Sequence, residues 1–329
     1  MKAIWLERTG GPEVLDYRDI PTPVPGPGQV LVNAHFIGVN MPEVLVRRGV
    51  YPRMPHLPTV PGIEMSGLVV AAGPNVRSLR EGQAVYVSAR ELPQRAGCYA
   101  EYIAVDENVP YPLPEGIDLQ AAATLASYQV AYHLLRSATA GIPFQSVLIK
   151  AAAGGVGTAL VQLAKESGAQ VIGLVRSEAK AEFVRAQGAT VVIKEQLENV
   201  AARVADVTQG RGVDLVLDPV GGARFLDNFE LLAPLGLVVL FGVLDGPPPD
   251  FVSAMLNRSL KSPAVRVFNM HMLNENRETR RTATSALLEM LVKGKIRPVV
   301  HDRLALAEAA KAQTLLESGK VLGNLLLYP

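Results

Sequence analysis

Residues 147–157 read Val147-Leu148-Ile149-Lys150-Ala151-Ala152-Ala153-Gly154-Gly155-Val156-Gly157. The apolar run predicts a buried strand, and the glycine turn after it opens directly into a stretch with helical spacing. Glycine lets the backbone turn tightly and approach a phosphate, and a helix N-terminus offers free N–H groups with a partial positive charge. The stretch therefore predicts a dinucleotide-binding turn, with Gly154, Gly155, Val156 and Gly157 against the pyrophosphate.

The residues around this turn alternate between strand and helix patterns. Strands are predicted at 146–150, 170–175, 190–193, 213–217 and 237–241, with a further strand near 264–268. Helices are predicted at 156–167 and 178–186, and around 226–232. A further helix, after the strand at 190–193, is predicted to end at about residue 208. Such alternation predicts an α/β Rossmann domain with a doubly wound parallel sheet. A strand-to-helix turn that binds nothing is the alternative. A P-loop is excluded, because Lys-Ser/Thr does not follow the last glycine.

The parts of the chain outside this region have a different sequence pattern. Before residue 120, prolines separate short β-branched runs such as 29–39 and 65–71, which predicts a β-rich domain. The tail predicts helices at 279–292 and 306–318 and a closing strand at 321–328. We therefore expect three segments: 1–119, 120–267 and 268–329.

The end of the second predicted strand indicates which dinucleotide is bound. NAD sites place an acid there to hold the ribose 2′-hydroxyl, but this chain has Arg176-Ser177, with Lys180 one turn further. Two cations favour the 2′-phosphate of NADP(H), and Lys194 is a weaker third contact. The alternative is that both are solvated residues on a helix face, and Glu178 nearby opposes phosphate binding.

Composition excludes several classes of protein. The chain has 329 residues, a formal net charge of +1, 49% hydrophobic residues and one cysteine, Cys98. It lacks the basic stripe of a nucleic-acid binder, the cysteines of a zinc cluster and an apolar run long enough to span a bilayer. Its five histidines are scattered along the sequence. We expect a cytoplasmic protein without a metal that acts on a small molecule.

Several motifs together resemble the medium-chain dehydrogenase/reductase superfamily, and its zinc-free quinone oxidoreductase branch in particular. Beside the glycine turn, they are 10–15 (GGPEVL), 38–40 (GVN), 48–52 (RGVYP), 60–64 (VPGIE), 97–102 (GCYAEY) and 218–222 (DPVGG). The resemblance implies a GroES-like catalytic domain made of the N-terminal part and the tail, with the Rossmann domain inserted. It also implies that the nicotinamide lies in the cleft between the two.

The resemblance also implies site residues. Zinc-containing relatives carry a Cys and a His where this chain has Asn40 and Ile63, which implies that catalytic zinc is absent. Asn40 and Tyr51 match positions that line the nicotinamide cleft, and Tyr51 is a candidate proton donor or only a coenzyme contact. The turn Phe241-Gly242-Val243 should touch the coenzyme, because ligands bind at the carboxyl ends of strands.

Two departures from the branch stand out: Ser127 replaces a common Lys, and Glu195 replaces a Tyr or His that covers the adenosine. An acid beside a 2′-phosphate is unfavourable.

The first interpretation is an NADPH-dependent reductase of quinones or α,β-unsaturated carbonyl compounds. The second is an enoyl thioester reductase, with Arg47 and Arg48 as candidates for a basic patch, and the third is a non-catalytic, crystallin-like NADPH-binding protein. A homodimer paired through residues 264–268 is expected.

Overall fold

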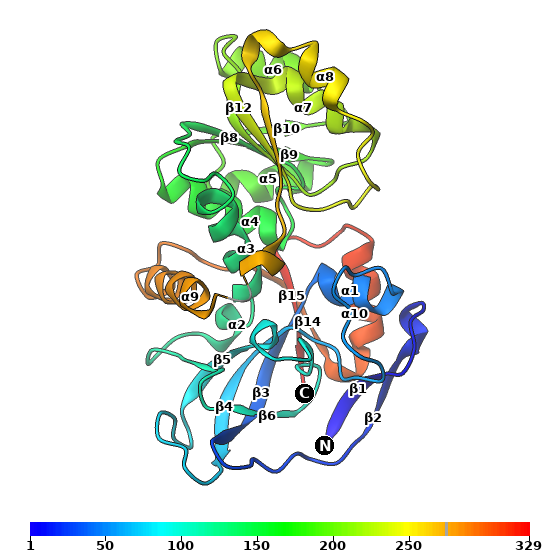
Figure 1. Ribbon diagram of the computed structural model, residues 1–329, viewed down its shortest axis with the longest axis vertical. Coiled ribbons are helices and arrows are strands. Elements are labelled where there is room, and N and C mark those ends of the chain that lie inside the picture. The colour runs from blue at the N-terminus through cyan, green and yellow to red at the C-terminus, as the bar shows by residue number, and fades with distance from the viewer. Residues whose placement is uncertain (274–275) are drawn as a thin grey trace. The chain divides into compact units, whose positions relative to one another are not determined.

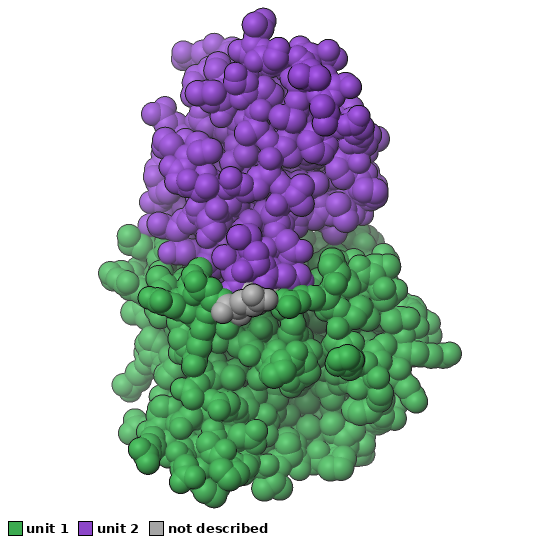
Figure 2. All heavy atoms as spheres, viewed as in Figure 1, with its two compact units in different colours: residues 1–127, 276–329 green, residues 128–275 purple. Residues whose placement is uncertain are grey.

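The computed structural model of the chain describes residues 1–273 and 276–329. The chain forms two compact units, which Figure 2 distinguishes by colour. Unit 1 comprises residues 1–127 and 276–329, and unit 2 comprises 128–275. The first boundary falls inside helix α3 (Leu125–Arg136), some residues beyond the composition change near residue 119. Both ends of the chain therefore contribute to one unit.

Unit 2 is built on a six-stranded sheet in the order β10-β9-β8-β11-β12-β13, and every pair in it is parallel (Figure 1). The order reverses direction beside β8, which is the doubly wound arrangement predicted from the sequence. The strands are β8 (Ser146–Ile149), β9 (Gln170–Val175), β10 (Val191–Lys194), β11 (Val213–Asp218), β12 (Leu232–Leu240) and β13 (Ala264–Val267).

Helices connect these strands, as parallel pairing requires. They are α4 (Gly155–Glu166), α5 (Glu178–Gln187), α6 (Val200–Val207), α7 (Asn228–Leu231) and α8 (Val252–Leu256). The strands read as continuous apolar runs because both faces of the sheet are covered: all four residues of β8 are buried. The predicted α/β fold class is confirmed.

Strand β12 begins earlier than predicted, at Leu232, where a helix was expected to end. Its pairing with β11 jumps from Leu232 opposite Val213 to Leu237 opposite Leu215, so the intervening residues bulge out of the ladder. Leu235 lies in this bulge with φ +62° and a side chain that is 74% exposed. The interruption hides the first half of the strand from a pattern-based prediction.

Unit 1 is β-rich, in agreement with the sequence. Its larger sheet runs β14-β15-β3-β4-β5-β7, β6 also pairs with β3, and β1 and β2 form a separate ribbon. The strands of the N-terminal part are β1 (Lys2–Leu6), β2 (Leu15–Asp19), β3 (Gln29–Val39), β4 (Glu64–Ala72), β5 (Ala84–Ser88), β6 (Tyr102–Asp106) and β7 (Tyr111–Pro112). Helices α1 (Met41–Arg48) and α2 (Leu119–Ala122) are short.

The tail returns to the N-terminal sheet. Strand β15 (Asn324–Tyr328) pairs antiparallel with β3, and β14 (Val300–Ala305) pairs parallel with β15. Helices α9 (Arg277–Val292) and α10 (Ala309–Glu317) match the predicted helices, whereas β14 was missed. Three consecutive residues of β14, His301 to Arg303, are exposed, so it carries little apolar alternation. Within the described residues, no helix is both long and apolar enough to cross a bilayer.

Candidate functional site

The predicted phosphate turn stands at the carboxyl end of β8. Gly154 is the N-cap of α4, and no side chain caps this helix. A Cβ at Gly157 would meet the Ala151 carbonyl oxygen at 2.4 Å, so glycine is required for the helix to pack this close to the turn. Ala151, where the commoner motif has its first glycine, takes φ +51°. The first turn of α4 therefore offers uncapped amides to an anion, which fits the phosphates of a dinucleotide.

The predicted 2′-phosphate contacts gather at the end of β9. Arg176 follows the strand, and Ser177 is the N-cap of α5, where its side chain accepts a hydrogen bond from the Lys180 amide at 3.4 Å. Burial, and then the charge of Arg176, lower the pKa of Lys180. Glu178 is engaged elsewhere, since its Oε2 lies 2.6 Å from the Nζ of Lys194. The acid that most directly opposes a phosphate here is therefore not Glu178.

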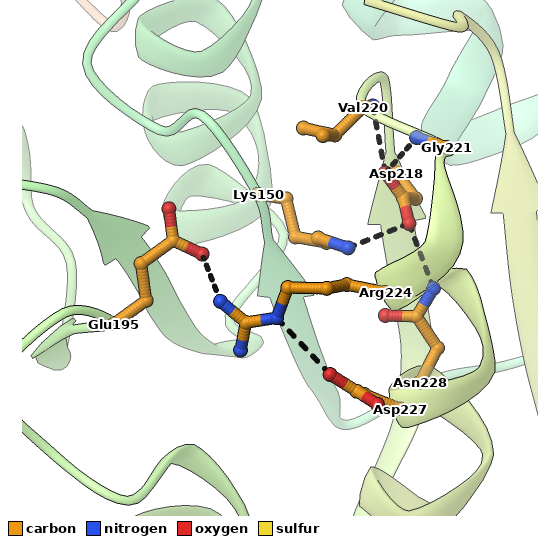
Figure 3. Close-up of polar contacts among 8 residues, drawn as sticks. All are labelled: Lys150, Glu195, Asp218, Val220, Gly221, Arg224, Asp227 and Asn228. Atoms are coloured by element: carbon orange, nitrogen blue, oxygen red, sulfur yellow. Dashed lines mark hydrogen bonds and ion pairs between the residues drawn. The ribbon is translucent and has the colours of Figure 1, made fainter. Parts of the chain in front are cut away.

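The acid that most directly opposes a phosphate at this position is Glu195, which lies directly after β10. Its Oε1 lies 3.2 Å from Nε of Arg176, and its Oε2 lies 4.0 Å from Nη1 of Arg224. Arg224 belongs to the short 3-10 helix 223–227 that follows β11, and Figure 3 shows its guanidinium between Glu195 and Asp227. Arg224 was not predicted as a site residue, because no local motif marks an arginine that joins the site from another strand end.

The predicted turn after β12 packs against the turn after β11. The Phe241 amide donates to the Asp218 carbonyl at 3.0 Å, and a Cβ at Gly242 would lie 2.6 Å from the Pro219 carbonyl oxygen. Gly242 is thus required by the neighbouring backbone, whatever else the turn binds. Val243 remains 54% exposed at the same sheet edge.

A buried ion pair joins the ends of β8 and β11 beneath this edge. Nζ of Lys150 lies 2.8 Å from Oδ2 of Asp218, which also accepts from Nδ2 of Asn228 at 2.7 Å (Figure 3). Oδ1 of Asp218 accepts from the amides of Val220 and Gly221. Because Asp218 is fully buried and fully hydrogen-bonded, the pair orients the two strand ends and is not a free catalytic acid.

In unit 1, Asn40 follows β3 as the N-cap residue of α1 and is held by a buried carboxylate. Its Nδ2 donates to Oε1 of Glu64 at 2.9 Å, while Oε2 of Glu64 accepts from Tyr86 at 3.2 Å and from the Ala126 amide at 2.7 Å. Burial raises the pKa of Glu64 to about 7, although the hydrogen bond from Asn40 acts in the opposite direction. Asn40 is thereby oriented through its amide nitrogen.

A second buried carboxylate, Glu43 of α1, lies in the same cluster. Its Oε1 accepts from the Ile63 amide at 3.2 Å, and its Oε2 is buried without a hydrogen-bond partner. Burial raises the pKa of Glu43 to about 8. Burial also raises the pKa of Tyr51. The charge of Arg90 lowers this pKa, and the charge of Glu43 raises it. Tyr51 therefore stays protonated at neutral pH and can donate a hydrogen bond.

Two further expectations concern unit 1. Ile63 is 7% exposed and carries no ligand atom, and the described residues hold no group of three His, Cys, Asp or Glu side chains able to bind a metal. Arg47, a candidate for an exposed basic patch, is instead 1% exposed and donates to Gln313 at 2.7 Å and to Glu317 at 2.6 Å. That expectation is wrong for Arg47, because its guanidinium ties α1 to α10.

These features define a class of protein: a Rossmann domain with an open phosphate turn, linked to a β-rich domain assembled from both chain ends. Comparison with known proteins agrees. Residues 26–115 match the family model described as alcohol dehydrogenase GroES-like domain, and residues 155–288 match the model described as zinc-binding dehydrogenase.

Full-length relatives narrow the class. A quinone oxidoreductase of Pseudomonas aeruginosa is 35% identical over 100% of this chain and 99% of its own length. The structure of Escherichia coli quinone oxidoreductase complexed with NADPH has a TM-score of 0.89 and 30% identity, covering 100% of both chains. An NAD-dependent alcohol dehydrogenase has a TM-score of 0.88 and 29% identity, also over 100% of both chains. The chain belongs to the quinone oxidoreductase family of the medium-chain dehydrogenases/reductases and is an oxidoreductase.

Proposed function

We propose that the chain is a zinc-independent reductase that transfers hydride from NADPH to a quinone. The observation that carries the proposal is the uncapped N-terminus of α4 behind the glycine turn, with the Arg176 and Lys180 cations one strand away. The quinone oxidoreductases among the relatives support the acceptor, and the NADPH complex of one of them supports the coenzyme. No comparable observation favours an enoyl thioester reductase or a non-catalytic binding protein.

The coenzyme would be held by the carboxyl edge of the unit 2 sheet. The amides of Gly155, Val156 and Gly157 are proposed to donate to the pyrophosphate, which the partial positive charge of the helix end would stabilise. Arg176, Ser177 and Lys180 are proposed for the 2′-phosphate, and the 241–243 turn for the nicotinamide half. When bound, the coenzyme supplies the hydride, and the protein supplies position and charge.

The residues of unit 1 are proposed to complete the reduction. A quinone that accepts hydride becomes an oxyanion, which a hydrogen-bond donor stabilises and then protonates. Tyr51 can donate because its phenol is neutral, and the Asn40 amide is presented in a fixed orientation by Glu64. Tyr51 is therefore the proposed proton donor, with water as the alternative source, and no step requires a metal.

A substitution at the helix N-cap tests the coenzyme site apart from folding. Gly154 has φ −79°, and a Cβ there would lie 3.7 Å from the nearest atom, so Gly154→Ala and Gly154→Asp both fit. Aspartate caps the helix and stabilises it by a few tenths of a kcal/mol, but its charge repels a pyrophosphate. We expect Gly154→Asp to keep or raise the melting temperature and to weaken NADPH binding at least ~30-fold.

Two controls accompany this variant. Gly154→Ala should bind NADPH nearly as wild type, and Asn276→Asp adds the same charge at the N-cap of α9 without affecting binding. NADPH oxidation by the wild type with a quinone panel, enones and enoyl thioesters then identifies the acceptor. If calorimetry detects no NADPH binding by the wild type, or if Gly154→Asp binds as tightly as Gly154→Ala, the proposed function is refuted.

We also propose a homodimer formed through β13, in a cytoplasmic location where NADPH is regenerated. β13 is the last strand of its sheet, and the preceding segment exposes Leu256 (68%) and Leu260 (102%), while Val267 of the strand is 71% exposed. A row of unpaired backbone groups beside apolar side chains is a natural pairing edge. Leu260→Asp should shift sedimentation toward monomer, and Val24→Asp, at another exposed apolar site (86%) in unit 1, should not.

A further inference from the structure

A pocket of about 420 Å³ opens at the carboxyl edge of the unit 2 sheet, entirely within this unit. The residues that matter here come from four strand ends: Lys150, Leu174, Arg176, Glu195, Val220 and Arg224. The pocket adjoins the end of β9, where the 2′-position of the coenzyme ribose is proposed to lie. Carboxylates outnumber cations in its lining, so the pocket as a whole is not built to attract a dianion.

The cations of this lining are not equally available. Lys150 is committed to Asp218 in a buried pair with side-chain exposures of 8% and 0%. The guanidinium groups of Arg176 and Arg224 are exposed by 62% and 60%, so they can reorient toward a ligand. In the structure both face Glu195, and Arg224 also contacts Asp227 at 3.2 Å.

Glu195 is the least exposed of the three side chains in these ion pairs. Its side chain is only 18% exposed, and its Oε1 faces Arg176. Its Oε2 faces a different arginine, Arg224, as Figure 3 shows. A phosphate that binds Arg176 must therefore replace the Glu195 carboxylate as the ionic partner of this guanidinium. The same carboxylate is also a good acceptor for a neutral hydroxyl group.

We propose that Glu195 is a specificity-determining residue that limits discrimination between NADPH and NADH by competing with the 2′-phosphate for Arg176 and Arg224. A coenzyme with a 2′-phosphate gains the arginines only after Glu195 loses them, and it also meets like-charge repulsion. A coenzyme with a free 2′-hydroxyl leaves the ion pairs intact and can donate to Glu195. The chain therefore uses NADH as well as NADPH, and removal of the Glu195 charge shifts it toward NADPH.

This inference rests on the proposed function, since it assumes that unit 2 binds a nicotinamide dinucleotide. Glu195→Gln tests it, because glutamine keeps the size and one acceptor oxygen but removes the charge. Dissociation constants for NADPH, NADH, 2′,5′-ADP and 5′-AMP are measured by calorimetry. The adenosine fragments report on the 2′-position without any contribution from catalysis. We expect NADPH and 2′,5′-ADP to bind about tenfold tighter to the variant, and NADH and 5′-AMP to bind as before or more weakly.

Glu178→Gln is the matched control. Glu178 is two residues from Arg176 but pairs with Arg185 and Lys194, and it does not line the pocket. A change in general charge alone would strengthen NADPH binding in both variants, whereas the proposal confines the gain to Glu195→Gln. In addition, the gain from Glu195→Gln should be smaller in an Arg176→Ala background, because the competition is for that guanidinium.

The outcomes separate the two proposals. If the wild type binds NADPH but Glu195→Gln leaves the ratio of NADPH to NADH affinity unchanged, or if Glu178→Gln changes it equally, the inference is overturned and the proposed function stands. If the wild type binds neither coenzyme, the proposed function itself fails. A wild type that already prefers NADPH by more than a thousandfold would also overturn the inference.

Discussion

The buried carboxyl group of Glu43, in which Oε2 has no hydrogen-bond partner, should make the stability of unit 1 depend on pH in a range where most proteins are insensitive to it. Burial raises the pKa of Glu43 to about 8 and that of Glu64 to about 7, from an ordinary value of 4.5. The folded chain therefore holds these protons more tightly than the unfolded chain. The stabilisation is complete below the unfolded pKa and is lost as the pH rises through the folded pKa.

The size of the effect follows from these values. Between about pH 6 and about pH 9, loss of the Glu43 proton should lower the free energy of unfolding by about 3 kcal/mol, and loss of the Glu64 proton by about 1 kcal/mol. Glu43→Gln removes the titrating group but keeps the acceptor for the Ile63 amide. The variant should therefore retain only the smaller decrease, and its advantage over the wild type should grow as the pH rises.

Urea unfolding at several pH values measures this directly. The chain has a single tryptophan, Trp5, which lies in β1 of unit 1 with the Arg18 guanidinium 4.5 Å from its ring centroid. Its fluorescence therefore reports on the unit that contains Glu43. Glu115→Gln, at an exposed position of the same unit, is the control and should follow the wild type. A wild-type stability that is flat over this pH range, or an unchanged slope in Glu43→Gln, would refute the reasoning.

Three further predictions concern single positions. Ala151→Gly relieves a left-handed conformation at an exposed site and should raise the free energy of unfolding by about 0.5–1 kcal/mol, measured by urea titration; a destabilised variant would contradict the strain. Tyr51→Phe should lower kcat for quinone reduction about 100-fold or more while NADPH affinity is retained, and an unchanged kcat would assign the proton to water. Asp218→Asn leaves Lys150 buried with a neutral partner and should cost about 3–5 kcal/mol; a loss below about 1 kcal/mol would show that the pair is not structural.

The sequence was sufficient wherever the interactions that determine the structure are local. Buried parallel strands carry their own apolar pattern, so residues 170–175 were predicted with the bounds that β9 has. The glycine turn was recognisable because Gly157 must lack a Cβ to pack against Ala151, and this requirement restricts the position to glycine. Asn40 and Tyr51 were proposed from motifs that neighbour them in the chain, and their roles stay predictions.

The sequence also indicated that Glu195 departs from the residues that its relatives carry at this position, but it did not indicate what Glu195 contacts. Its partners come from the end of β9 and from the helical turn after β11, so their meeting depends on the strand order of the sheet. The same holds for Glu43 and Glu64, whose raised pKa values arise from complete burial, and for Arg47, which reads as a surface cation until α10 covers it. Local pattern determines which segments form strands, helices and turns, because backbone conformation depends on near neighbours. Only the tertiary structure decides which charges are buried, paired or left without a partner, because solvation depends on what distant parts of the chain are folded against them.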